Sequence, residues 1–262
     1  MRAFFKAFVT ELKRNILSLK FPAMILLVIA GYIVSSIEEL RFMWNYPKSD
    51  VIYFFVLSHN VGSFTIISVL CCTVLNCITF LQDYRSGYFR QCIIRSGKGS
   101  YAAAKYLSCI ISGGLILSLG QVFYVVVLAM RFPLIAQGSS MAESIMHSGD
   151  FTGELLVGGS TVGYFIVYAW LAFIYGAMWS GVGVTVSAFF DDYYAASFSP
   201  YVISFASSGV LSGFFSPEII FHCSFNLGGA FSSICYSTLY LGAIIAVFAI
   251  LFCKRVRWRC EE

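Results

Sequence analysis

The residues best suited to chemistry lie between two apolar runs, in the segment DYRSGYFRQCIIRSGKGSYAAAK at positions 83–105. Glycine next to lysine, as in its SGKGS portion, is typical of loops that hold nucleotide phosphates on backbone amides. Such a loop requires the spacing GxxxxGK followed by serine or threonine. Here Cys92 occupies the position of the first glycine, and Gly99 follows Lys98. The sequence therefore predicts no phosphate-binding loop in this segment.

Other reactive residue types are present without the partners that their chemistry requires. His59, His147 and His222 have no HxxxH or paired CxxC spacing that would hold a metal ion. No HExxH, no GxSxG and no paired catalytic acids occur within or beside an apolar run. Most of the nine cysteines lie in apolar runs, where a free thiol behaves as a small hydrophobe. We expect no catalytic residue, no metal site and no cofactor bound by this chain.

Composition places the chain in a bilayer. The 262 residues are 59% hydrophobic and only 11% charged, and the mean hydropathy is +0.81. About 20 apolar residues are needed to cross a hydrocarbon core. Uncharged runs long enough for this recur along the chain. They predict an all-α integral membrane protein with a single transmembrane domain over 1–262 and six spans, at about 21–37, 59–81, 106–130, 161–190, 198–215 and 232–253.

The distribution of basic residues predicts the orientation. If six spans are present, 14 of the 17 lysines and arginines lie on the side that holds both termini and the segment 83–105, and three lie on the other side. Cytoplasmic loops carry this excess, so we expect cytoplasmic N- and C-termini in a multi-pass protein of the cell membrane, in a bacterium its cytoplasmic membrane. The net charge of +4 then reflects topology, and we expect no nucleic-acid partner.

Residues 1–20 form an amphipathic pattern, with phenylalanines and leucines on one face and lysines and arginines mainly opposite. We expect an interfacial helix that contacts membrane lipid and serves either as an anchor alone or also as a contact for a cytoplasmic partner. The stretch VIYFFVLSHN at 51–60 is interpreted as an interfacial or kinked segment, and the polar connection at 131–154 as a small lid or a disordered loop.

The last two predicted spans carry features of their own. Four serines, Ser204, Ser208, Ser212 and Ser216, recur every four residues along one face of the predicted fifth span. Such a stripe either lets helices approach closely or lines a polar translocation pathway. Between spans five and six, helix breakers such as Pro217 interrupt an apolar stretch, which predicts a re-entrant segment.

The segment 83–105 predicts a short cytoplasmic helix over about 83–95, a break at Gly97 and Gly99, and a second helix that enters the third span. Because two membrane spans hold this short helix, a partner could push it as a lever. Asp191 and Asp192 mark the shortest predicted cytoplasmic connection, after span four. They form either a second, smaller partner contact or a solvated turn.

This arrangement resembles the permeases of ATP-binding-cassette transporters, specifically the six-span permeases of the type-2 exporter family. There, an acidic residue and a glycine after span two precede a coupling helix, an apolar pair, a turn and a Tyr-x-x-x-Lys. The matching residues here are Asp83, Gly87, Ile93, Ile94, Tyr101 and Lys105. The chain departs from the pattern in having aspartate where glutamate is usual and RSGKGS where a proline-containing turn is common.

The resemblance implies that two six-span permeases, identical or homologous, pair in the membrane. It also implies that two cytoplasmic ATPase subunits bind ATP and magnesium and drive them. The residues expected to couple to the ATPase are Asp83, Tyr84, Gly87, Tyr88, Ile93, Arg95, Asp191 and Asp192.

We therefore expect an ATP-driven exporter subunit, without enzymatic activity of its own, that moves an amphiphile such as a hydrophobic peptide, a lipid-linked molecule or a drug. Proton- and ion-coupled carriers usually keep ionisable groups near the midplane, and His59 is the one candidate within the predicted spans. Two alternatives stay open. One is a stand-alone secondary transporter or channel, and the other is a non-transporting membrane protein that senses a peptide or confers immunity to it.

Overall fold

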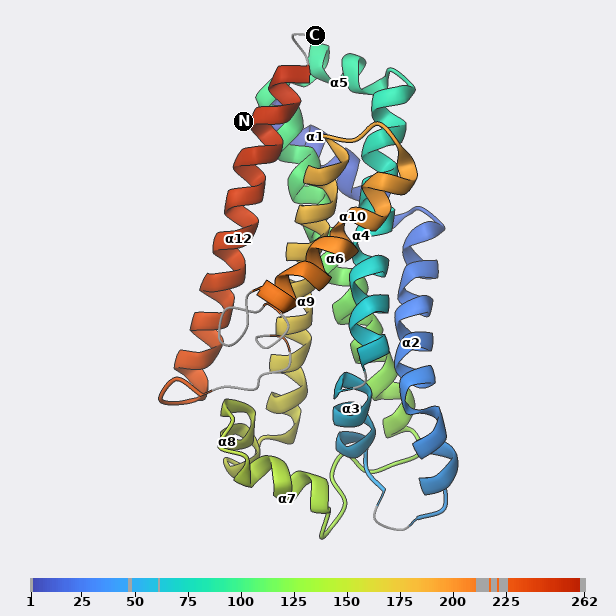
Figure 1. Ribbon diagram of the computed structural model, residues 1–262, viewed down its shortest axis with the longest axis vertical. Helices are drawn as coiled ribbons and strands as arrows, with labels where there is room; N and C mark the ends of the chain where they lie inside the picture. The colour runs from blue at the N-terminus through green and yellow to red at the C-terminus, as the bar shows by residue number, and fades with distance from the viewer. Residues whose placement is uncertain are drawn as a thin grey trace.

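Long helices that run side by side make up most of the computed structural model, which describes residues 2–46, 49–60, 62–210, 217, 221 and 226–259 (Figure 1). No β-strand occurs among these residues. Both termini lie at the end of the molecule that carries α5, and α7 and α8 lie at the opposite end. The helices are α1 Arg2–Ile16, α2 Lys20–Met43, α3 Val51–Asn60, α4 Gly62–Arg85, α5 Tyr88–Ser96, α6 Lys98–Ala129, α7 Ser140–His147, α8 Phe151–Val157, α9 Thr161–Ser187, α10 Tyr193–Val210 and α12 Ala230–Arg259.

Within the described residues, five helical segments are long and apolar enough to cross a membrane: Lys20–Met43, Ile67–Arg85, Lys98–Ala129, Thr161–Ser187 and Ala230–Arg259. The chain is thus all-helical, with the composition and helix lengths of a membrane-embedded protein. Several helices extend beyond the predicted apolar spans. For example, α2 continues through Glu38, Glu39 and Arg41, because charged residues end an apolar run without ending a helix.

The fifth predicted span, 198–215, coincides only in part with a described helix. Its first part lies in α10, which contains five serines and Pro200 and is not among the five candidate spans. Residues 211–215 and most of the predicted re-entrant segment lie outside the described residues. A six-span topology therefore stays a prediction.

The stretch at 51–60 and the polar connection at 131–154 both contain helices. The stretch at 51–60 is a helix of its own, α3, and its Val51, Phe54 and Phe55 side chains are fully buried in the main hydrophobic core. The connection after α6 contains α7 and α8, which pack against each other. The hydroxyl of Ser139 caps α7 by accepting a hydrogen bond from the backbone amide of Ala142.

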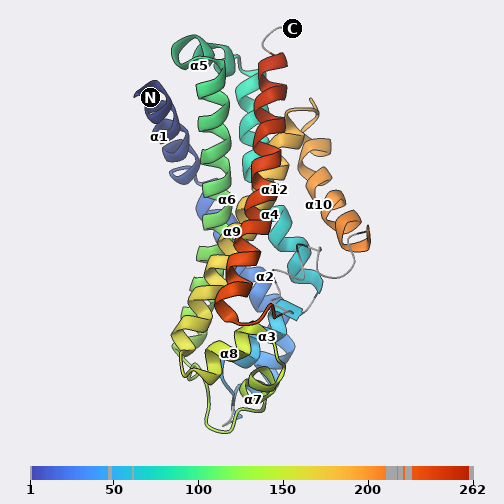
Figure 2. The ribbon, with the colours of Figure 1, turned by 90° about the vertical axis from the view of Figure 1, so that its left-hand side faces the viewer.

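The centre of the bundle is a close crossing of α6 and α9, which lie between α1 and α10 in Figure 2. A Cβ atom added to Gly176 of α9 would lie 2.8 Å from the carbonyl oxygen of Gly113 on α6. A Cβ atom added to Gly113 would lie 2.3 Å from that of Ser180. Glycine at both positions lets the two backbones approach as small residues do in membrane helix pairs.

A buried polar cluster joins α4 to this crossing. The side-chain amide of Asn76 on α4 donates to the Ser180 hydroxyl at 2.6 Å and to the Cys109 carbonyl oxygen at 3.2 Å. Its oxygen accepts from Ser112 at 2.9 Å, and Ser180 donates to the Cys109 carbonyl oxygen at 2.8 Å. Because these groups hydrogen-bond to one another, they fix the register of α4, α6 and α9.

Replacement of Gly176 by alanine should destabilise the crossing, because its methyl group would meet the backbone of α6 rather than a side chain that can move. We expect the free energy of unfolding to fall by about 1–3 kcal/mol, the usual cost of overpacking. The measurement is the midpoint of thermal unfolding of the purified protein in detergent.

The matched control is Gly242→Ala, because a Cβ atom at this position of α12 would meet nothing within 4 Å. We expect an unchanged or slightly higher midpoint for it, since alanine favours a helix over glycine. Equal midpoints for the two variants would contradict the close crossing.

Candidate functional site

The short helix α5 lies at one end of the bundle, between α4 and α6 (Figure 1). The predicted single helix from Asp83 to Arg95 is interrupted: α4 runs on to Arg85, and α5 begins only at Tyr88. Gly87 has a φ of 74°, which side chains with a Cβ atom rarely adopt, so the chain turns there. Gly97, with a φ of 83°, ends α5 as predicted, whereas Gly99 lies inside α6 and breaks nothing.

One face of α5 is anchored to the bundle. Phe89 is buried, with its ring 6.3 Å from that of Phe80 and 5.5 Å from that of Tyr101. Ile93, one turn later, packs against the same apolar cluster. Tyr88 lies beneath Arg14 of α1, whose guanidinium carbon is 5.0 Å from the ring centroid. These contacts hold α5 to α1, α4 and α6.

The opposite face of α5 is open. It presents Arg90, Gln91, Ile94 and Arg95, and Ile94 is 84% exposed. Ile93 was expected at the partner contact, and Ile94 only as the second member of an apolar pair. The four-residue spacing from Phe89 to Ile93 was the available signal, because residues four apart share a helix face and the next residue points elsewhere.

Asp83, which we expected at the partner contact, instead belongs to a buried ion cluster. Its carboxylate lies 2.7 Å from the Lys105 ammonium and 2.6 Å from the Arg14 guanidinium. Glu11 of α1 completes the cluster, 2.9 Å from Lys105 and 3.1 Å from Arg14. Lys105 is 0% exposed and Asp83 is 5% exposed, so neither presents a charge at the surface.

The ion cluster joins three helices, because its members come from α1, from the end of α4 and from the start of α6. Its two carboxylates and two cations balance in charge. Burial alone would lower the pKa of Arg14, but its hydrogen bond with Asp83 and the attraction of Asp83 and Glu11 outweigh this and raise the pKa. Glu11 and Arg14 were not expected in the site, since nothing local in the sequence pairs them with Asp83.

Asp191 and Asp192 lie in the turn between α9 and α10. Asp192 accepts a hydrogen bond from the backbone amide of Ala195 at 2.9 Å and so caps α10. The Asp191 carboxylate is 2.8 Å from the Arg259 guanidinium of α12, and its backbone carbonyl accepts from Arg85 of α4. The Asp191 side chain stays 77% exposed, so it ties this turn to two neighbours and still faces outward.

The remaining candidates are divided between described and undescribed parts of the chain. Ser204 is buried in α10 and Ser208 is half-buried, with its hydroxyl donating to the Phe205 carbonyl oxygen. Ser212 and Ser216 lie outside the described residues. Across the described part of the chain, no group of three or more histidine, cysteine, aspartate or glutamate side chains is placed to hold a metal ion.

No protein-family model, curated protein or solved structure matches this chain. The candidate site thus consists of the exposed apolar and basic face of α5 together with the ion cluster that joins α1, α4 and α6.

Replacement of Lys105 by methionine should strongly destabilise the protein, because Arg14 alone would then face two buried carboxylates. Breaking a buried ion pair from one side costs about 3–5 kcal/mol. The measurement is the midpoint of thermal unfolding in detergent, with Arg90→Met, which removes an exposed cation from α5, as the control.

The double variant Asp83→Leu with Lys105→Met removes one charge of each sign and leaves Glu11 with Arg14. We expect it to be more stable than Lys105→Met alone. A Lys105→Met protein as stable as the Arg90→Met control would show that the ion cluster does not hold these helices.

Proposed function

We propose that this chain is the transmembrane permease subunit of an ATP-driven exporter of the ATP-binding-cassette class, powered by a separate ATPase subunit. The observation that carries the proposal is α5, a nine-residue helix turned out of the bundle between two glycines with positive φ. Its Phe89 is buried and its Ile94 is exposed.

The outer face of α5 has the chemistry of a protein contact. Ile94 supplies an apolar centre, and Arg90 and Arg95 supply flanking charges that an acidic or carbonyl-lined groove could pair. In this proposal the ATPase binds α5 through Ile94, Arg90 and Arg95, while Phe89 and Tyr88 hold the helix from behind.

The ion cluster supplies the means by which a push on α5 reaches the membrane. Lys105, near the start of α6, binds both Asp83, near the end of α4, and Glu11 of α1. The two helices on either side of α5 thus form one mechanical unit with α1. When ATP closes the ATPase pair, this unit tilts and the pathway changes the side on which it opens. The outward-facing Asp191, at the same end, offers a second and smaller contact.

The proposed side of the membrane follows from charge. Basic residues of α1, α5 and the end of α12 gather with both termini at the α5 end (Figure 1), and such an excess marks the cytoplasmic side. ATP is available there, so the α5 end faces the ATPase. In this orientation the protein lies in the cell membrane with cytoplasmic termini, and the predicted span 198–215, which includes part of α10, completes a six-span topology.

The proposed cargo is an amphiphile, such as a hydrophobic peptide, a lipid-linked molecule or a drug. In the described bundle the charges of the ion cluster, Glu11, Arg14, Asp83 and Lys105, neutralise one another at the α5 end, which favours ATP over an ion gradient as the energy source. The pathway then runs between this chain and a second permease, identical or homologous, with the serines of α10 as candidate lining residues.

Replacement of Ile94 by glutamate should weaken the ATPase contact without unfolding the bundle, because this side chain is 84% exposed. The test purifies the tagged chain from its native membrane and identifies co-purifying proteins that carry a GxxxxGK[ST] loop. It then measures the ATP hydrolysis of the complex. We expect at least about a tenfold loss of bound ATPase, as for a central interface residue.

The matched control is Val157→Glu, which places the same charge on an exposed apolar position at the opposite end of the molecule. Full ATPase binding is expected for this control. Gradient-driven flux by the chain alone in liposomes, with no ATPase, would contradict the proposal and favour a secondary transporter or channel.

A further inference from the structure

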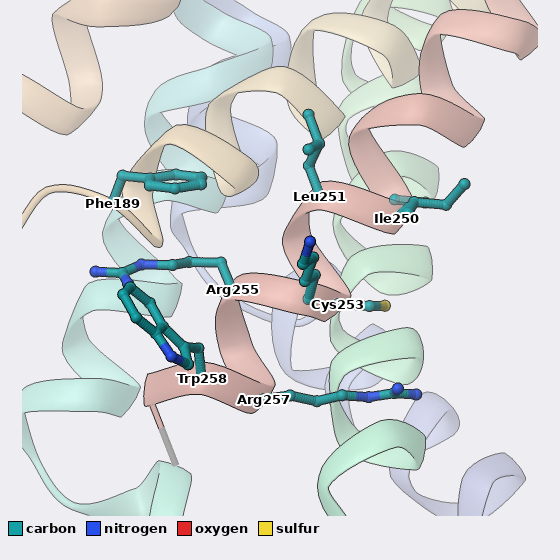
Figure 3. Close-up of a pocket in the computed structure, with 9 residues that line it drawn as sticks. Phe189, Ile250, Leu251, Cys253, Arg255, Arg257 and Trp258 are labelled. Atoms are coloured by element: carbon teal, nitrogen blue, oxygen red, sulfur yellow. The ribbon is translucent and has the colours of Figure 1, made fainter. Parts of the chain in front are cut away.

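A shallow pocket of about 860 Å³ lies where the apolar part of α12 gives way to its basic end (Figure 3). Phe189, just after α9, forms one wall. On α12, Ile250 and Leu251 are 68% and 43% exposed and lie on the membrane side of Lys254. The pocket therefore has an apolar half and a charged half, in the order in which a lipid presents its chains and its headgroup.

Three cations surround the charged half. Lys254, Arg255 and Arg257 all line the pocket, and none of them takes part in the ion pairs found among the described residues. The neighbouring Asp191 is bound by Arg259 instead. On the outward face of α12, Arg255 and Arg257 lie on either side of Lys254 at helical spacing. Among the described residues, these three cations of the pocket thus have no acidic partner.

Two aromatic rings hold one of these cations in position. The Arg255 guanidinium carbon is 5.3 Å from the Phe189 ring centroid and 5.0 Å from that of Trp258. Its Nε donates to the Ala188 carbonyl oxygen at 3.4 Å. Figure 3 shows Arg255 beside Trp258 and Arg257 pointing away from them. Cation–π contacts leave most of the guanidinium N–H groups able to bind phosphate oxygens, and tryptophan favours the headgroup level of a bilayer.

We propose that this pocket binds one anionic phospholipid, with its phosphate and headgroup on Lys254, Arg255 and Arg257 and an acyl chain along Ile250, Leu251 and Phe189. A zwitterionic lipid would bring an ammonium group next to three cations, so a net negative headgroup is preferred. Juxtamembrane basic clusters attract such lipids through the same field. The proposal rests on α12 crossing the membrane and is independent of the transport function.

The bound lipid has a structural consequence. Arg255 belongs to α12, while Phe189 and Ala188 follow α9, so a lipid in this pocket touches both helices at the same end. Only a small part of α12 is buried in the described chain. The bound lipid would therefore add contacts to α12, which has few others, and anionic lipid should raise the thermal stability of the whole protein.

The test uses the full chain, delipidated in dodecyl maltoside and titrated with phosphatidylglycerol or with phosphatidylcholine of the same acyl chains. Native mass spectrometry counts the lipids retained, and thermal unfolding reports stabilisation. We expect one tightly retained phosphatidylglycerol, about tenfold tighter binding of it than of phosphatidylcholine, and a higher unfolding midpoint with phosphatidylglycerol only.

The site variant is Lys254→Gln with Arg257→Gln, and the control is Arg90→Gln with Arg95→Gln. All four cations are exposed at the same end, and the change in net charge is equal. We expect about a tenfold loss of phosphatidylglycerol affinity in the site variant alone. Equal affinity in the two double variants would overturn the proposal, because binding would then follow overall charge.

A third variant, Ile250→Ser, separates a lipid from a free phosphate. It removes the acyl contact and keeps all three cations, so we expect weaker binding of phosphatidylglycerol. Glycerol 3-phosphate added in excess should leave the bound lipid in place. Displacement of the lipid by glycerol 3-phosphate, or an unchanged affinity in Ile250→Ser, would show that the pocket recognises phosphate alone and would overturn the lipid assignment.

Discussion

The arrangement of this protein depends on two carboxylates and two cations enclosed where α1, α4 and α6 meet. Glu11, Asp83 and Lys105 are almost fully buried, where isolated charges would be very costly, so they are stable only together with one another and with the partly exposed Arg14. An amphipathic helix such as α1 could rest anywhere in the membrane interface. The ion cluster instead fixes α1 to one place, beside the helix that the proposal assigns to the ATPase contact.

The same ion cluster holds the two helices that flank α5 in a fixed arrangement. Both helices that flank α5 are held close to their ends, at Asp83 and at Lys105, while Asn76 and Ser180 fix α4 and α9 deeper in the bundle. At the crossing of α6 and α9, glycines leave no room for sliding. In the proposed mechanism, a force on α5 would therefore move the packed helices as a body rather than bend a loop.

The helical spans of this architecture could be predicted from the sequence, whereas the contacts between distant helices could not. Apolar runs are local signals, so the five candidate spans and the break at Gly97 could be predicted. The turn at Gly87 was not predicted, because a glycine near the end of a helix does not by itself require a positive φ. Glu11 and Lys105 are 94 residues apart, and no local pattern pairs them. The exposure of Ile94 depended on helix phase, which Phe89 sets through tertiary packing.

In the proposed mechanism, α1 and α5 move as one body when ATP closes the partner ATPase pair. Spin labels at Lys6→Cys and Arg90→Cys, in a cysteine-free background of the permease–ATPase complex in lipid nanodiscs, would test it by pulsed electron paramagnetic resonance. The account predicts an unchanged distance between α1 and α5 with and without ATP, and a changed distance between the α5 helices of the two permeases. A changed distance between α1 and α5, or an unchanged distance between the two α5 helices, would contradict it.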